Sequence, residues 1–156
     1  MSHESWMKEA LALARQNMGS QDGGPFGAVV VYEKKIIGRG SNRVLIDCDP
    51  TAHGEIIAIR EACLHLGNPH LNKAILYTSC EPCPMCLTAA LWARIETIYF
   101  AATREDAAKI GFDDAVFYEV FEKQESRHLI QRQSLMTSEG KAIFEDWKKM
   151  GNRLIY

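Results

Sequence analysis

The sequence predicts an α/β fold: a three-layer α/β/α sandwich whose mixed central sheet has about five strands. Two observations predict it. A β-rich hairpin pattern follows the first helical pattern, and strand and helix patterns then alternate to the end of the chain. This alternation is typical of a mixed sheet covered by helices on both faces. The 156 residues fit a single domain over 1–156, long enough to bury about 70% of the unfolded chain's surface.

The first half of the chain contains two helical patterns with a hairpin between them. Apolar residues recur at close to a 3.6-residue period over 4–18, which predicts an amphipathic helix, and GSQDGGP ends it. The runs FGAVVVYE and KIIGRGSN are apolar and β-rich, and they indicate a β-hairpin. A second helix is predicted over 49–67, with Asp-Pro-Thr as its start signal and Gly67 as its stop.

The second half begins with KAILYTSC, which predicts a buried strand. The next segment, PMCLTAALWARI, opens with Pro84, a favoured first residue of a helix, so Cys83 is expected near the N-cap. TIYFAA predicts another strand, and helical pieces follow over 103–122. A short strand near 129–135 and a helix over 138–150 complete the pattern.

Composition and charge narrow the class of protein. The formal net charge is -2 and no basic run is present, so nothing favours a nucleic-acid partner. No apolar stretch approaches the roughly 18 residues of a membrane span, and the N-terminus lacks the layout of a signal peptide. The five cysteines are odd in number and concentrated at metal-binding spacing, which fits a reducing compartment better than a disulfide framework. We therefore expect a cytoplasmic protein without a membrane partner.

Three cysteines, Cys80, Cys83 and Cys86, lie in the segment TSCEPCPMC. If all three bind a metal with one further ligand, the site is closed and structural; if only two bind, one coordination position stays open for chemistry. His53, upstream in TAHGEIIAI, is the natural nitrogen ligand, and Glu55 follows two residues later. Residues two apart do not share a helix face, so these side chains converge if they lie in the first turn of a helix. The predicted start signal places them there.

These residues together form a motif with a chemical interpretation. Two helix N-termini directed at one point supply a positive potential that favours thiolates. A His, Cys, Cys ligand set leaves a fourth position for water, with a carboxylate beside it to carry protons. H-x-E followed by P-C-x-x-C is the known signature of zinc-dependent nucleobase deaminases, and the chain matches it with HGE at 53–55 and PCPMC at 82–86. A lone C-x-x-C is weak evidence for a metal site, whereas the two motifs in this order are strong evidence for a zinc deaminase.

The chain resembles the cytidine deaminase-like zinc deaminase superfamily, and within it the bacterial guanine deaminases. The resemblance extends over nearly the whole length, through GGPFGAVVV, DPTAHGEIIAIR, LYTSCEPCPMC, WAR, GFDDAVFY and a terminal tyrosine. Alanine is the commoner residue where this chain has Gly54, a departure expected to cost little. The resemblance implies that His53, Cys83 and Cys86 bind one zinc ion per chain, whereas Cys80 packs at the strand end.

The resemblance also implies roles on the substrate side. Phe26 and Asn42 would hold a purine base, and Trp92 would form part of the pocket wall. Asp114 would contact the base and help to relay protons. In the resembling family the C-terminal segment is exchanged between two subunits, so Tyr156 would cover the pocket of the partner in a homodimer.

The implied reaction is the zinc-dependent hydrolytic deamination of guanine to xanthine and ammonia, in purine catabolism or salvage. Glu55 would take a proton from water and deliver it to ring N3 while the attack occurs at C2. The tRNA adenosine deaminases, which share DPTAHAE and EPCxMC, are the nearest alternative. They usually carry basic residues for an RNA stem, and this chain is slightly acidic. Guanosine and cytosine are further alternative substrates.

Other interpretations of the same residues remain open from the sequence. The zinc site could stabilise an interaction module without turnover, with Cys80 as its fourth ligand. Asn42 could be a turn residue, and Phe26 and Trp92 could be core aromatics. Asp114 could belong to a helix N-cap. The experiment that separates these classes is ammonia release from a panel of bases, nucleosides and tRNA.

Overall fold

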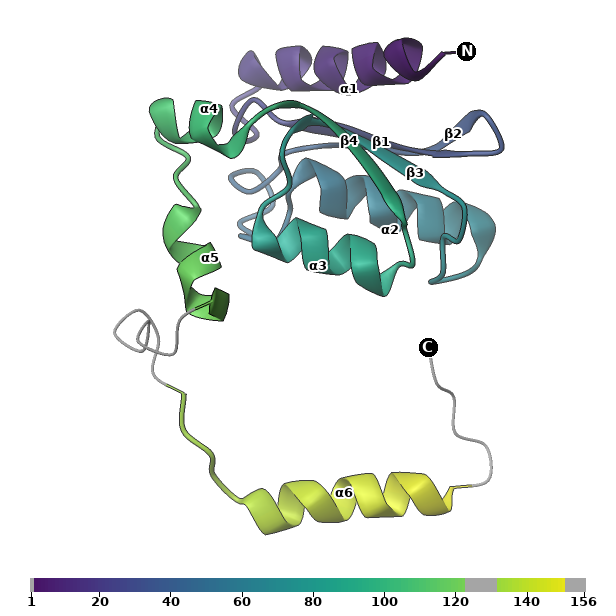
Figure 1. Ribbon diagram of the computed structural model, residues 1–156, viewed down its shortest axis with the longest axis vertical. Helices are drawn as coiled ribbons and strands as arrows, with labels where there is room; N and C mark the ends of the chain where they lie inside the picture. Colours follow the sequence, from purple (N-terminus) through teal and green to yellow (C-terminus); the bar gives the residue numbers. More distant parts are fainter. Residues whose placement is uncertain (1, 123–131, 151–156) are drawn as a thin grey trace. The chain divides into compact units, whose positions relative to one another are not determined.

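The computed structural model describes residues 2–122 and 132–150 (Figure 1). The described residues form four strands and six helices; after an initial helix and hairpin, helices and strands alternate as far as β4, and three helices follow. The sequence therefore predicted the order of these elements correctly. In chain order they are α1 His3–Met18, β1 Gly27–Tyr32, β2 Lys35–Ser41, α2 Gly54–Leu66, β3 Ile75–Cys80, α3 Pro84–Trp92, β4 Thr97–Ala102, α4 Arg104–Lys109, α5 Ala115–Glu122 and α6 Thr137–Lys149.

The four strands form one mixed sheet in the order β2-β1-β3-β4. β1 pairs antiparallel with β2 and with β3, whereas β3 and β4 are parallel. The predicted count of about five strands is corrected to four in the described part of the chain. Of the strand predicted near 129–135, residues 129–131 lie outside the described residues, and 132–135 form no strand. Their Arg-Gln-Ser-Leu sequence has no run of apolar side chains to pack on a sheet.

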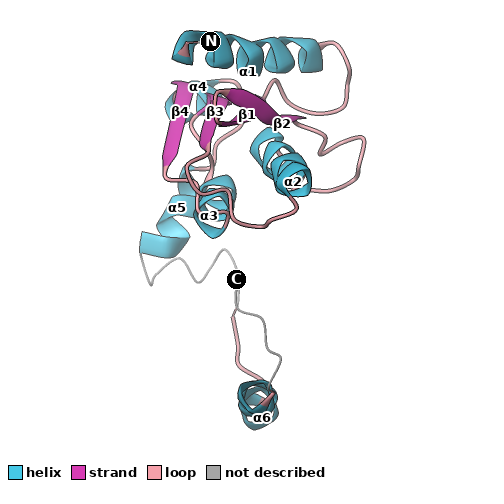
Figure 2. Ribbon diagram, turned by 90° about the vertical axis from the view of Figure 1, so that its right-hand side faces the viewer, coloured by secondary structure: helices cyan, strands magenta, loops and turns pink. Residues whose placement is uncertain are grey.

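Helices cover both faces of the sheet (Figures 1 and 2). Along β1 the side chains alternate between the two faces, as the period of a strand requires. Val29 and Val31 pack with Trp6 of α1 on one face. Ala28 and Val30 belong to the other core cluster, to which α2 and α3 contribute. The predicted three-layer sandwich is confirmed.

The start of α2 lies directly against β2, because glycines face each other there. A Cβ added at Gly40 of β2 would overlap the carbonyl oxygen of Gly54, the first residue of α2. A Cβ added at Gly54 would instead lie 3.2 Å from the Gly40 carbonyl oxygen, which is close but not an overlap. Gly40 therefore sets how near the first turn of α2 comes to the sheet.

The beginning of α2 differs from the prediction. The helix begins at Gly54, not near 49, with His53 as its N-cap. The Asp49 side chain accepts hydrogen bonds from the Thr51 backbone N–H at 2.8 Å and from the Thr51 hydroxyl at 2.7 Å. This local turn competes with helix formation, as Asp and Thr side chains often do. The predicted end is confirmed, since Gly67 has a left-handed φ of 60° just after the last turn.

The chain divides into two compact units, residues 1–116 and 117–156. The sandwich belongs to the first unit. The described part of the second contains α6, close to the predicted range of 138–150, and this helix has no buried residue. The prediction of one domain over 1–156 remains a prediction. Among the described helices, none has the length and apolar character needed to cross a membrane.

Candidate metal centre and substrate pocket

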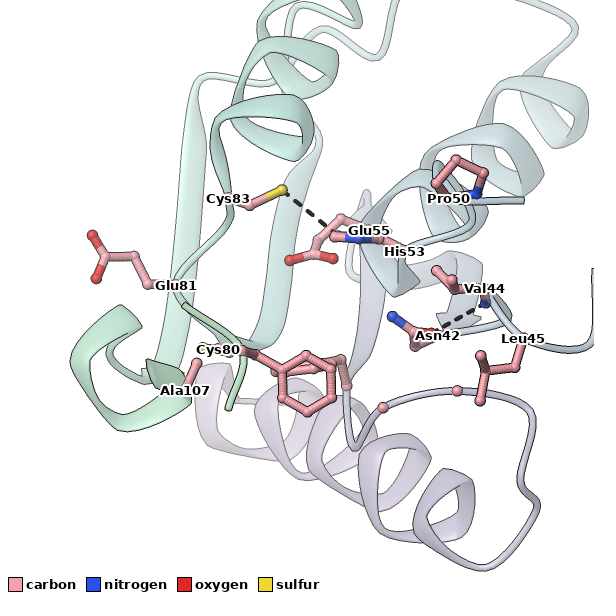
Figure 3. A pocket seen from close by; sticks show the side chains of 14 residues that line it. Asn42, Val44, Leu45, Pro50, His53, Glu55, Cys80, Glu81, Cys83 and Ala107 are labelled. Carbon is pink, nitrogen blue, oxygen red and sulfur yellow. Dashed lines mark hydrogen bonds between the residues drawn. The ribbon is translucent and has the colours of Figure 1, made fainter. Parts of the chain in front are cut away.

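The metal ligands come from the first residues of two helices. His53 is the N-cap of α2, Cys83 is the N-cap of α3, and Cys86 is the third residue of α3. N-caps are usually Ser, Thr, Asp or Asn, whose side chains bond to the helix backbone. Here neither N-cap side chain makes such a bond, so the imidazole and the thiol are available for another partner. His53 Nδ1 lies 3.6 Å from Cys83 Sγ (Figure 3). The same nitrogen lies 3.5 Å from Cys86 Sγ.

The three ligand atoms fit a bound cation. Nδ1 of His53 and the two sulfurs all lie within 4.8 Å of one another. The pKa of Cys83 is lowered to about 4 by hydrogen bonds from Cys86 and His53. The pKa of Cys86 is raised, because its thiol donates to Cys83 and is buried. Two adjacent sulfurs can both ionise only when a cation neutralises them. One imidazole and two thiolates suit zinc and leave its fourth coordination position open.

Cys80 stands apart from this group. Its thiol donates to the Thr103 carbonyl oxygen at 3.5 Å, and burial raises its pKa to about 11. Among the described residues, the ligand atoms that converge are those of His53, Cys83 and Cys86. The geometry therefore favours an open site with three protein ligands over a closed site with Cys80 as the fourth.

Glu55 lies beside the metal ligands and is 6% exposed. Its Oε1 accepts a hydrogen bond from the hydroxyl of Thr78, in β3, at 3.1 Å. Its Oε2 lies 3.5 Å from the Cys86 sulfur, which places this oxygen next to the metal ligands. Burial raises the pKa of the Glu55 carboxyl. A buried carboxyl that Thr78 fixes at one oxygen, with its other oxygen beside the metal ligands, can carry a proton to a group positioned beside the metal.

A cavity of about 450 Å³ opens onto this cluster (Figure 3). Its size is within the range of pockets that bind small molecules. Much of the remaining wall comes from two loops: residues 19–26, between α1 and β1, and the loop that follows β2 from Asn42. Phe112, which follows α4, completes it. Phe26 and Phe112 form an edge-to-face pair there, with ring centroids 4.9 Å apart. The lining residues are Gly23, Gly24, Phe26, Asn42, Val44, Leu45, Pro50, His53, Glu55, Cys80, Glu81, Cys83, Ala107 and Phe112.

Asn42 is the polar side chain of the loop side. It is 4% exposed and follows β2 directly. Its Oδ1 accepts a hydrogen bond from the Val44 backbone N–H at 3.2 Å. The amide nitrogen consequently points away from Val44 and into the pocket (Figure 3). The side chain thus presents a hydrogen-bond donor to a bound molecule.

The structure brings most of the predicted site residues together. Phe26, Asn42, His53, Glu55 and Cys83 all line the cavity, and Cys86 is fully buried behind it. These residues come from four separate parts of the sequence: the segments before β1 and after β2, and the starts of α2 and α3.

Three predicted residues are placed differently. Asp114 does not line the cavity but is half-buried close to it, and burial together with the charge of Cys83 raises its pKa. The prediction that Trp92 forms a pocket wall is not met within this chain. Trp92 ends α3, at the opposite end from Cys83, and is 59% exposed. Tyr156 lies outside the described residues.

The sequence analysis did not identify Thr78, which bonds to Glu55, nor several residues that line the pocket. Thr78 gave one signal, a hydroxyl within a strand that was predicted to be buried. Glu81 lies inside the TSCEPCPMC segment, in which only the cysteines were assigned a role. Phe112 lies inside the GFDDAVFY segment, but the resemblance gave it no role. Val44 and Leu45 gave no signal, because only the folded chain brings them to the cavity.

Comparison with known proteins agrees with this geometry. Residues 1–102 match the cytidine and deoxycytidylate deaminase zinc-binding region. The chain belongs to this family of zinc-binding deaminases. Guanine deaminase of Bacillus subtilis (strain 168) is 44% identical over 156 residues, which are 100% of both chains. The resemblance predicted from the sequence is confirmed.

Two further comparisons place the chain within the family. An X-ray structure of guanine deaminase from Bacillus subtilis, 44% identical, matches with a TM-score of 0.95 and covers 100% of this chain and 99% of that chain. The tRNA-specific adenosine deaminase of Aquifex aeolicus (strain VF5) is 33% identical over 156 residues, 99% of this chain and 100% of that protein. Guanine deaminase is therefore the more similar of the two relatives in sequence.

Proposed function

We propose that the chain is a zinc-dependent guanine deaminase, a hydrolase that converts guanine and water to xanthine and ammonia. One observation carries the proposal. A buried carboxyl, Glu55, lies beside the ligand cluster of His53, Cys83 and Cys86 in a cavity of about 450 Å³. The full-length similarity to the Bacillus subtilis guanine deaminase supports guanine as the substrate.

The chain's own residues perform the proton transfers. His53, Cys83 and Cys86 would hold zinc, which when bound lowers the pKa of a coordinated water toward roughly 7. Glu55 accepts a proton from the attacking water and delivers it to N3 of guanine. Glu55 next takes the remaining proton from the hydroxyl group now on C2 and passes it to the 2-amino group. The C2–N bond then breaks, so ammonia leaves and a C2 carbonyl forms. Thr78 fixes one carboxyl oxygen by its hydrogen bond, so the carboxyl stays directed at the reacting atoms.

The loop side binds the purine ring. Phe26 packs against the base, and the amide nitrogen of Asn42 donates a hydrogen bond to one of its acceptor atoms. Asp114, half-buried near Cys83, is the second acidic group and assists the departure of ammonia. The pocket therefore binds a small purine base.

The test is ammonia release by the zinc-loaded protein from guanine, adenine, cytosine, guanosine, adenosine and tRNA. We expect guanine to give the highest kcat/KM. Adenosine in tRNA is the second candidate, because a full-length relative at 33% identity is a tRNA-specific adenosine deaminase. If ammonia were released faster from tRNA than from guanine, adenosine in tRNA would be the substrate and guanine would not. No release from any compound would favour the non-catalytic interaction module.

We also propose that the protein is a homodimer whose subunits exchange their C-terminal segments. The enzyme would act in the cytoplasm, in guanine catabolism. Apolar side chains that would be costly to leave in water support it. Ile143, Phe144 and Trp147 lie on one face of the amphipathic helix α6, and Leu91 of α3 is 61% exposed. An amphipathic helix gains most of its stability by packing its apolar face, and a second copy of the chain would provide the surface.

A mixed dimer tests the exchange and the role of Tyr156. One chain lacks residues 152–156, and the other carries Glu55→Gln. With exchange, the intact tail of the Glu55→Gln chain covers the intact Glu55 site, so one site per dimer works. Without exchange, each site has one defect and the mixture is inactive. An inactive mixed dimer, or a fully active monomer, contradicts the exchange.

A further inference from the structure

Asn17, in the last turn of α1, is a polar residue on the buried side of an amphipathic helix. It is 4% exposed, which is unusual for asparagine. Its side-chain nitrogen donates two hydrogen bonds, to the Gly24 carbonyl oxygen at 2.6 Å and to the Asn42 carbonyl oxygen at 2.8 Å. Both acceptors belong to residues that line the pocket. One amide group therefore connects the two loops on the substrate side.

These two loops are also joined to each other through the backbone. The Asn42 N–H donates to the Phe26 carbonyl oxygen at 3.0 Å, and within the first loop the Phe26 N–H donates to the Gly24 carbonyl oxygen at 2.8 Å. The Leu45 N–H donates to the Asp22 carbonyl oxygen at 2.9 Å. Asn17 is the side chain that ties this pair of loops to α1, and so to the sheet that α1 covers.

The position of the Asn42 backbone decides where its side chain points. The Asn42 Oδ1 lies so close to Gly23 that a Cβ on that glycine would overlap it. The same oxygen is held by the Val44 N–H, so the amide has little room to rotate. A shift of the Asn42 carbonyl would therefore move the donor that faces the substrate.

We propose that Asn17 is a positioning residue for substrate binding, which acts by fixing the backbone of Asn42 and of the loop that contains Phe26. The inference rests on the proposed function, because it assigns a binding role to Asn42. Asn17 itself does not line the cavity. Its effect should therefore appear in KM, with the zinc site and the proton transfers left intact.

The first test compares Asn17→Ala with Asn17→Asp, which keeps the shape but removes both donors. We expect each to raise KM for the base about tenfold, since buried acceptors lose a partner, and to leave kcat within about threefold. Zinc content should not change. Met7→Ala, which removes packing on the same face of α1, is the control and should lower thermal stability without changing KM. An Asn17→Asp protein with the KM of the unmodified protein would overturn the proposal.

A double-mutant cycle tests whether Asn17 acts through Asn42. In an Asn42→Ala background the donor is already absent, so adding Asn17→Ala should raise KM by much less than tenfold. Full additivity of the two effects would contradict the mechanism, and would assign Asn17 to general stability. The cycle uses whichever base the panel identifies as substrate, so a different substrate does not affect it.

Hydrogen exchange separates failure of this inference from failure of the proposed function. Asn17→Ala should speed exchange at the amides of Phe26, Asn42 and Leu45, and leave the first turns of α2 and α3 unchanged. This holds even if no base is deaminated. Unchanged exchange at the three loop amides would overturn the positioning role.

Discussion

The metal side and the substrate side of the pocket are built in different ways. On the metal side, the first turns of α2 and α3 hold His53, Cys83 and Cys86, all within three residues of a helix start. On the substrate side, two loops are held by hydrogen bonds between distant segments, including those from Asn17. On the proposed function, the proton transfers depend on residues at helix starts, and the choice of base depends on loops. Mutations on the two sides should separate turnover from affinity.

The largest expected effect is at the metal ligands. Cys83→Ser and Cys86→Ser should lose both zinc and activity, because each removes one of three protein ligands. Cys80→Ser is the matched control, since its thiol bonds to the Thr103 carbonyl instead. It should keep about one zinc per chain and most activity. Metal analysis beside the ammonia assay measures both, and zinc loss in Cys80→Ser would refute the open-site interpretation.

The next effect is at the proton carrier. Glu55→Gln should keep zinc and fold but lower kcat by about 10²–10⁴-fold, because glutamine has nearly the same shape and cannot shuttle protons. Steady-state kinetics on zinc-replete protein measure it. Near-normal turnover would remove Glu55 from the mechanism.

The contact between Gly40 of β2 and Gly54 of α2 sets the distance of the α2 start from the sheet, and its effect on stability can be measured. Gly40→Ala should lower the free energy of unfolding by about 1–3 kcal/mol, because its Cβ would overlap the Gly54 carbonyl and displace the start of α2. Gly54→Ala, on the other side of the same contact, should change it by less than about 1 kcal/mol, since helix propensity offsets a tight contact. Denaturant unfolding compares the two. Equal effects would mean that this contact does not position the helix.

The smallest effect is expected at Thr78, which holds Glu55. Thr78→Val should lower kcat about fivefold, corresponding to the loss of one hydrogen bond of about 1 kcal/mol, with KM little changed. Thr97→Val, on the exposed part of β4, makes the same chemical change away from the pocket and should leave kcat unaltered. A larger change in KM than in kcat at Thr78 would place it on the substrate side.

The same division explains what could be predicted from the sequence. Pro84, the C-x-x-C spacing and His53 are local signals, so the metal ligands and Glu55 followed from helix starts even though α2 begins five residues later than predicted. Asn17 and Thr78 act through hydrogen bonds to residues 23–25 positions away in the chain. No local pattern encodes such contacts. Trp92 lies at the opposite end of α3 from Cys83, and its assignment to the pocket wall stays a prediction.

The most direct test of the division is the kinetic comparison of Glu55→Gln and Asn42→Ala on zinc-replete protein with guanine. We expect Glu55→Gln to lower kcat by about 10²–10⁴-fold with KM nearly unchanged. Asn42→Ala should raise KM by about tenfold or more, because it removes the donor to the base, and should keep most of kcat. If both variants reduced kcat and left KM unchanged, the separation of chemistry from base recognition would be wrong.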